Sequence, residues 1–350
     1  MSREDRLKRR LLRELVDQNL ELVEGGPPRR LRPRRRFRWA GALLAVAIAP
    51  MALLGSARYR DAAETKSARP PEPSLAARFA QIEADPEFAA GQPSAIDPAV
   101  FPLAVRRIAI DAGHGGKALG ARSPSGALEK DIALDIALRL RDALVASSFE
   151  VVLTRSDDSE VSLAERARRA NAASADLFVS IHLNWIAEGN TRGVETYYAG
   201  PTDDPELSRL AAIENRESGY SVADFRRLLD RVYAGAREGS SKKLADSIEQ
   251  SLYGSLSKVA PTLSDRGIKA APFIVLLSTE MPAVLAEVSC LSNREEDEML
   301  ARPLYREYIA EALARGIRRY ALAAEGAPAP LTQQIASETV APKAAPEKKP

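Results

Sequence analysis

Short apolar runs alternate with amphipathic helical patterns between residues 103 and 324, and this alternation restricts the fold more than any other feature of the sequence. In the first helical pattern, Ile132, Ile136, Leu140 and Leu144 recur at every fourth position, which places them on one face of a helix. Strands that alternate with such helices form α/β layers around a largely parallel sheet. We therefore expect a single α/β domain with a mostly parallel, twisted sheet flanked by helices.

Six apolar runs have the length and composition of buried strands. Three helical patterns lie among them, and in the second Ser162 precedes Glu165 by three residues, the spacing of a capping box. The expected strands are 106–110, 149–155, 175–184, 193–199, 273–277 and 283–289, and the expected helices are 129–147, 162–174 and 303–324.

The N-terminal part of the chain has the pattern of an exported protein. Residues 1–38 end in a cluster of seven arginines within 29–38, and residues 39–57 carry no charge and would span about 28 Å as a helix. The positive-inside rule places residues 1–38 in the cytoplasm and the chain beyond residue 57 outside it, in a periplasmic or extracytoplasmic location. We expect 39–57 to be a transmembrane anchor or a signal segment. In favour of a signal segment, the sequence "LLGSA" would suit a signal peptidase, and "RRRF" resembles a twin-arginine signal. A buried helical hairpin is a further alternative.

Composition adds limits on the partners and on the remaining segments. The formal net charge of +2 is accompanied by one local basic patch, so it does not indicate nucleic-acid binding. The single cysteine, Cys290, excludes an intrachain disulfide framework and a cysteine-rich zinc cluster. Residues 58–102, rich in Ala, Pro, Glu and Ser, predict a linker with one short helix at 75–85, and residues 325–350 predict a disordered tail.

Both histidines of the chain follow or end expected strands, where α/β sheets gather their active groups. His114 lies in the glycine-rich turn "DAGHGG", in which core packing does not explain a histidine, and His182 lies near the end of the strand 175–184. Glu129 opens the helix that follows the turn, where the helix dipole favours a carboxylate. Because two histidines and a glutamate are a common ligand set of zinc hydrolases, these three residues predict a zinc site. Each of them alone also has a structural alternative, as a packed or surface histidine or as a helix-dipole partner.

Glu287 interrupts the otherwise apolar strand 283–289. Burying a carboxylate among Val, Leu and Ala is costly unless the group is paired or is poised to transfer a proton. We therefore expect Glu287 to be the general base of a hydrolytic reaction. A buried ion pair with Arg166 or Arg155 is the alternative.

Six sequence blocks in this order resemble the zinc-dependent N-acetylmuramoyl-L-alanine amidases of the Amidase_3 group over about residues 105–320. They are "IAIDAGHGGKALGA", "EKDIALDIALRLRDAL", "VVLTRSDD", "LAERARRANAASADLFVSIHLN", "GVETYY" and "PAVLAEVSCLSNREEDEML". The resemblance implies that His114, Glu129 and His182 bind Zn²⁺ and that Glu287 is the catalytic glutamate. It also implies that the substrate is peptidoglycan, cut between the lactyl group of N-acetylmuramic acid and the first L-alanine of the stem peptide. The chain departs from the family at Ser289 and Cys290, where a Gly-Phe pair is usual, and we expect this change to open the pocket without loss of activity.

A long stretch between "GVETYY" and "DRGIKAAPF" is similar to cell-division amidases that carry a self-blocking helix. That resemblance predicts a regulatory insertion at about 204–240, with Glu214 or Glu217 at the open coordination position of the metal. It implies an activator protein that displaces the helix, and a role in cell-wall remodelling or daughter-cell separation. The alternative is a solvated helical decoration.

Two other functions are compatible with parts of the pattern. An amidase-like domain without metal would be a wall-binding or regulatory module. A sugar de-N-acetylase would use the same ligand types, although the order of the blocks does not fit it.

Overall fold

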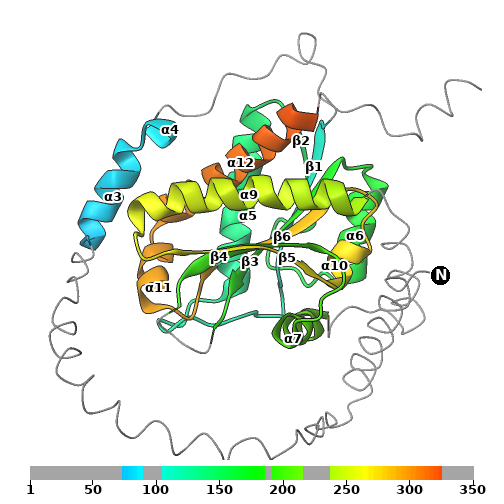
Figure 1. The fold of residues 1–350 in the computed structure, drawn as a ribbon, viewed down its shortest axis with the longest axis horizontal. Helices are drawn as coiled ribbons and strands as arrows, with labels where there is room; N and C mark the ends of the chain where they lie inside the picture. Colours follow the sequence, from blue (N-terminus) through cyan, green and yellow to red (C-terminus); the bar gives the residue numbers. More distant parts are fainter. Residues whose placement is uncertain (1–72, 90–104, 187–190, 216–236, 325–350) are drawn as a thin grey trace, which may run out of the picture.

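The computed structural model describes residues 73–89, 105–186, 191–215 and 237–324. Six strands form one mixed sheet in the order β2-β1-β3-β6-β4-β5, with helices against both faces (Figure 1). Neighbouring strands are parallel except for β4 and β6, which are antiparallel. The predicted α/β fold with a mostly parallel, helix-flanked sheet is thus confirmed. The strands are β1 (Arg107–Ala112), β2 (Glu150–Leu153), β3 (Leu177–Asn184), β4 (Gly193–Ala199), β5 (Ser264–Ala271) and β6 (Ala283–Cys290).

The helices divide between the two faces of the sheet. The long helices α5 (Glu129–Ala146), α9 (Arg237–Val259) and α12 (Pro303–Ala324) pack together on one face. The shorter helices α6 (Leu163–Ala172), α7 (Pro205–Glu214) and α10 (Ile274–Leu277) lie toward the other face, and α11 (Arg294–Leu300) follows β6.

Each face of the sheet has its own hydrophobic core, because successive side chains of a strand point to opposite sides. In β1, Ile108 and Ile110 join the core under α5, α9 and α12, whereas Ala109 joins the core under α6 and α10. The helix α5 buries Ile132, Ile136 and the other apolar residues of its predicted stripe. The periodicity read from the sequence therefore assigned these side chains to the correct face.

The N-cap predicted at Ser162 is also confirmed. Ser162 caps α6, with its hydroxyl accepting a hydrogen bond of 3.3 Å from the backbone N–H of Glu165. The predicted helices 129–147, 162–174 and 303–324 correspond to α5, α6 and α12.

Two strand assignments differ from the sequence-based prediction, and the helices α4, α9 and α11 were not among the predicted elements. The run 273–277, predicted to be a strand, is the short helix α10, and the strand β5 was not predicted. A short apolar run is compatible with either a helix or a strand when it is buried on all sides, so periodicity could not decide the first case. In the second case, β5 lies at an edge of the sheet and has a mostly polar, half-exposed sequence without alternation.

Part of the predicted linker packs against the domain. Residues Leu75–Ala84 form α3 and Pro86–Ala89 form α4, and α3 contacts α9 and α12. Ile82 is fully buried in the larger core, and Arg78 forms an ion pair of 3.1 Å with Glu295. The short helix expected at 75–85 is therefore an integral part of the folded unit rather than a piece of free tether.

Within the described ranges, no helix is both long enough and apolar enough to cross a membrane. The predicted basic segment 1–38, the predicted membrane segment 39–57 and the predicted tail 325–350 lie outside the described residues.

Candidate metal centre

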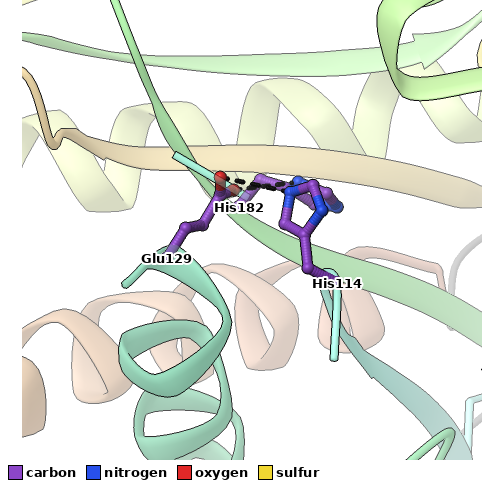
Figure 2. Close-up of side chains that lie close together, drawn as sticks. All are labelled: His114, Glu129 and His182. Atoms are coloured by element: carbon purple, nitrogen blue, oxygen red, sulfur yellow. Dashed lines mark hydrogen bonds and ion pairs between the residues drawn. The ribbon is translucent and has the colours of Figure 1, made fainter. Parts of the chain in front are cut away.

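The three predicted ligands converge at the carboxyl ends of β1 and β3. His114 follows β1, His182 is near the end of β3, and Glu129 is the first residue of α5 (Figure 2). Because β1 and β3 are parallel neighbours, their ends bring the two imidazoles together, with ring centroids 4.9 Å apart. Residues separated by up to 68 positions in the sequence thus form one cluster.

The carboxylate of Glu129 lies between the two imidazoles. Its Oε2 is 3.1 Å from His114 Nε2, and its Oε1 is 3.1 Å from His182 Nδ1 (Figure 2). Two backbone amides hold this carboxylate, since Ala121 N–H donates to Oε2 at 2.8 Å and Leu183 N–H donates to Oε1 at 3.0 Å. The orientation of Glu129 is therefore set by the main chain on both sides of the cluster.

The turn that carries His114 depends on unusual backbone geometry. His114 has φ +58°, in the left-handed region that non-glycine residues rarely adopt. Gly120 has φ +67°, and a Cβ atom there would lie 2.5 Å from Glu129 Oε2 and 2.6 Å from His114 Cδ2. A Cβ atom at Gly113 would lie 2.6 Å from the His182 ring. Glycine at these two positions leaves the space that the ligands occupy.

Two buried arginines fix the carbonyl groups of this turn. Arg166 donates to Ala112 O at 2.6 Å and to His114 O at 2.5 Å. Arg155 donates to Ala112 O at 2.9 Å and to Gly113 O at 2.8 Å. Sequence reasoning missed this role, because the arginines come from the strand-to-helix loop after β2 and from α6.

Arg166 also forms an ion pair of 2.8 Å with Asp111. Burial alone would raise the pKa of Asp111, but the charge of Arg166 and hydrogen bonds from Thr154 and Ser180 hold it below its usual value. No ion pair joins Glu287 to Arg155 or Arg166 among the described residues, so the alternative in which one of them neutralises Glu287 is wrong.

The cluster fits a divalent metal ion. One donor atom from each of the three residues lies within 4.8 Å of the others, and His114 Nε2 is buried without a hydrogen bond of acceptable geometry although Glu129 is 3.1 Å away. Donor atoms around a tetrahedral zinc ion are separated by about 3.3 Å, given zinc–nitrogen distances of about 2.0 Å. The 3.1 Å contacts on both sides of Glu129 are close to that separation.

The electrostatic environment of the cluster is anionic. Burial disfavours a charged imidazole at His114, yet the negative charges of Glu129 and Glu214 outweigh it and raise the pKa of His114 to about 9. Burial likewise opposes ionisation of Glu129, but His114 and His182 hold its pKa well below the usual value. A positively charged ligand is therefore favoured at this position.

Glu287 lies on β6 directly opposite His182 on β3 and lines the same cleft, which has a volume of about 930 Å³. Its side chain is buried, and its Oε2 has no hydrogen-bond partner in the described part of the chain. Burial, followed by the charges of Glu129, Glu195 and Glu214, raises the pKa of Glu287 well above its ordinary value. The Glu287 carboxyl group therefore has a high affinity for a proton, and it lies next to the three donor residues.

The predicted regulatory residue Glu214 approaches the cluster from the end of α7. Its Oε2 is 3.9 Å from His114 Nε2 and 4.0 Å from His182 Nδ1. Leu210 and Ile213 of the same helix line the cleft. Glu217, the other predicted regulatory residue, lies outside the described residues.

Sequence reasoning also missed Glu195. This residue lies on β4 opposite Glu287 and is 1% exposed, with Asn184, Lys269 and Arg266 as polar partners. The signal was available, since Glu195 interrupts the apolar strand "GVETYY" as Glu287 interrupts its own strand.

The change at Ser289 and Cys290 does not alter the cleft as expected. Both side chains are buried outside the cleft lining, and Ser289 Oγ donates to Glu296 Oε2 at 2.6 Å. The prediction that this pair opens the pocket is therefore wrong.

Comparisons with known proteins find a matching family, similar sequences and a similar structure. The sequence profile of the family described as N-acetylmuramoyl-L-alanine amidase, Amidase_3, matches residues 108–319. LytC of Bacillus subtilis, an N-acetylmuramoyl-L-alanine amidase, is 34% identical over 219 residues, which are 63% of this chain and 36% of LytC. AmiA of Escherichia coli, also an N-acetylmuramoyl-L-alanine amidase, is 32% identical over 225 residues, which are 61% of this chain and 76% of AmiA. The crystal structure of an N-acetylmuramoyl-L-alanine amidase from Clostridium difficile 630 is similar with 31% identity and a TM-score of 0.49, covering 63% of this chain and 99% of that chain.

Proposed function

The chain belongs to the Amidase_3 family of N-acetylmuramoyl-L-alanine amidases, and from this premise we propose that it is a zinc-dependent amidase of peptidoglycan. It hydrolyses the amide bond between N-acetylmuramic acid and the L-alanine of the stem peptide. The observation that carries the proposal is the buried Glu287 carboxylate, without a hydrogen-bond partner at Oε2 in the described residues, beside two histidines and a glutamate.

In this reaction, His114, Glu129 and His182 hold the zinc ion. A bound ion would supply Lewis acidity at the scissile carbonyl and would lower the pKa of a nearby water. Glu287 accepts the proton of the attacking water and then donates it to the departing alanine nitrogen. Arg155 and Arg166 keep the His114 turn in place through the carbonyl bonds described above.

The test is digestion of purified sacculi with and without a chelator, read by mass spectrometry of the products. We expect free stem peptides, and we expect the chelator to abolish their release. Products with de-N-acetylated sugars would instead indicate a deacetylase. A chain that binds sacculi, contains no metal and releases nothing would be a wall-binding or regulatory module.

The assignment of the base has its own test. Glu287→Gln keeps the size of the side chain but cannot accept the proton, so the variant should bind zinc normally and lose amidase activity by at least about a hundredfold. Metal content and stem-peptide release are measured on the same sample. Full turnover in the metal-loaded variant would exclude Glu287 as the base.

We further propose that α7 restricts the enzyme to a low basal rate and that an activator protein displaces it. Glu214 supports this role, since its carboxylate is 3.9–4.0 Å from a nitrogen of each imidazole, on a helix that lines the cleft. Glu214→Gln should therefore raise the basal rate of sacculus digestion. Glu206→Gln, an exposed change on the same helix, is the matched control. Equal basal rates for the two variants would exclude Glu214 as the inhibitory group.

The location and biological role complete the proposal. Because its substrate lies outside the cytoplasm, the domain functions in the periplasm or on the outer side of the membrane, exported or anchored through residues 39–57. The catalytic domain at 103–324 carries the packed helices α3 and α4 of the segment 58–102, and the segment 325–350 follows it. An enzyme restrained in this way suits cell-wall remodelling or the separation of daughter cells.

A further inference from the structure

Exposed apolar side chains gather at the cleft. Among the described residues, five large apolar side chains are exposed, and three of them, Leu119, Trp185 and Ile213, line the cleft that contains the His114, Glu129 and His182 cluster. Trp185 is 56% exposed, and it is the single exposed aromatic side chain in this part of the chain. A large exposed aromatic residue at a cleft is a typical feature of a binding site.

The backbone of Trp185 is held on both sides. Asn184 O accepts a hydrogen bond of 2.7 Å from Leu291 N–H, and Ile186 N–H donates to Ser292 Oγ at 3.0 Å. The Asn184 side chain also donates to the buried Glu195. The indole therefore projects from an ordered backbone, so that ligand binding would not cost the conformational entropy of ordering a loop.

The position of Trp185 in the cleft is near the place expected for the sugar of the proposed substrate. Trp185 follows His182 by three residues, and three residues of extended chain span about 10 Å. In a peptidoglycan amidase, the sugar is joined to the scissile amide through its lactyl group, so it would lie in the same cleft as the metal ligands, which Trp185 also lines. The surrounding lining is polar, with Asn184, Lys117 and Glu160 in the same cleft.

We propose that Trp185 is the stacking platform for a saccharide ring of the glycan strand. A pyranose presents a face of C–H groups that packs on an indole, while its hydroxyl groups at the ring edge reach polar side chains. A protein partner would instead require a much larger buried area than one indole and two aliphatic side chains supply. This inference rests on the proposed function, because it names the part of the amidase substrate that the cleft recognises.

The first test uses fluorescence and does not depend on catalysis. The chain has two tryptophans, so Trp39→Phe leaves Trp185 as the only one. The full-length, zinc-loaded variant, in a detergent without a sugar headgroup, is titrated with a peptide-free tetrasaccharide of N-acetylglucosamine. Since Trp185 is exposed with α7 in place, binding does not require displacement of the helix.

We expect a saturable change in emission with the tetrasaccharide and none with a free stem peptide. No change with the saccharide, or a change only with the stem peptide, overturns the proposal. A change produced only by a protein fraction would show that the indole docks a protein partner and would overturn it as well.

The second test separates binding from chemistry. On a disaccharide-peptide substrate, Trp185→Ala should raise KM roughly tenfold, the effect of losing one interfacial aromatic residue, with kcat unchanged. Trp185→Tyr should restore most of the affinity because it keeps an aromatic face. Val145→Ala, at a residue 55% exposed outside the cleft lining, is the control and should change neither constant.

The two tests distinguish the failure of this inference from the failure of the proposed function. If the chain releases no stem peptides from sacculi, the amidase proposal fails, and the fluorescence titration still reports whether Trp185 binds a saccharide. If amidase activity is present but Trp185→Ala has the KM of the parent chain, the saccharide platform alone is excluded.

Discussion

At the scale of single residues, the geometry of the candidate metal centre depends on residues without a reactive group as much as on the three predicted ligands. His114 has a left-handed backbone conformation, and the carbonyls around it are tied to Arg155 and Arg166. Strain of this kind persists only where the surrounding contacts hold it. Gly120 belongs to the same arrangement, since the space beside it is filled by Glu129 and His114.

Gly120→Ala should therefore disrupt the metal centre without touching a ligand. The new methyl group would collide with the Glu129 carboxylate and would also be strained at φ +67°. We expect metal affinity to fall by roughly 10- to 100-fold, as for other changes next to metal ligands. Zinc content after dialysis gives the measurement. Gly254→Ala, with no atom within 4 Å of the added methyl group, is the control, and equal zinc retention in both variants would contradict the prediction.

Glu249 gives a prediction about pH. It is 3% exposed, and burial, together with the nearby Asp265, raises its pKa from 4.5 to about 8, although Thr196 Oγ1 donates to it at 2.7 Å. Between these two pH values the folded chain binds more protons at Glu249 than the unfolded chain does. This group therefore lowers stability progressively as pH rises from 4.5 to about 8, and the penalty is constant above that range.

Glu249→Gln removes this titration. The melting temperature of the variant should rise relative to that of the parent chain between about pH 5 and about pH 8. Thermal unfolding of both proteins at the two pH values provides the comparison. A difference between them that is the same at both pH values would show that Glu249 does not titrate in this range.

At the scale of elements, α7 is attached to the domain at its C-terminal end. Asn215 is 7% exposed, and its side chain donates to Pro272 O at 2.9 Å and accepts from Ile274 N–H at 2.8 Å. Asp204 caps the other end through the N–H groups of Glu206 and Leu207. The helix that carries Glu214 is thus held over the cleft by these hydrogen bonds and by the packing of Ala211, Leu207 and Leu210, a limited attachment that suits the displacement proposed above.

Asn215→Ala should loosen this attachment. Two lost hydrogen bonds at about 1 kcal/mol each would shift the equilibrium of the helix toward the displaced state by up to roughly 30-fold. The basal rate of stem-peptide release should rise accordingly. Arg209→Ala, an exposed change on α7, is the control. If both variants digest sacculi at the parent rate, α7 does not limit access to the metal centre.

At the scale of the whole molecule, the folded unit begins before the strand β1. The helix α3 contacts α9 and α12, and Asp85 at its end is bound by Tyr308 and Lys258. The helix α3 therefore lies against the long-helix face of the domain, whereas residues at the carboxyl ends of β1 and β3 line the cleft.

Ile82→Ala measures the strength of this attachment. Ile82 is fully buried, so the change should lower the free energy of unfolding by about 2–4 kcal/mol, the usual cost of such a cavity. Urea denaturation gives the value, with the exposed change Gln81→Ala as the control. A loss below about 0.5 kcal/mol would mean that α3 does not contribute to the folded core.

Local sequence patterns were sufficient to predict much of the fold of this protein. Apolar periodicity identified five of the six strands and the helices α5, α6 and α12, since the side chains that face a core recur with the period of the backbone. The positions of His114, His182 and Glu129 relative to those elements then indicated one common edge of the sheet.

Tertiary contacts decided what local patterns could not. Contacts with neighbouring elements, rather than the periodicity of their own sequences, determine that 273–277 form a helix and 264–271 a strand. The packing of α3, the carbonyl contacts of Arg155 and Arg166, and the approach of Glu214 to the imidazoles likewise join residues far apart in the chain. Such contacts depend on how layers pack, and a period within one element carries no information about the element that will lie against it.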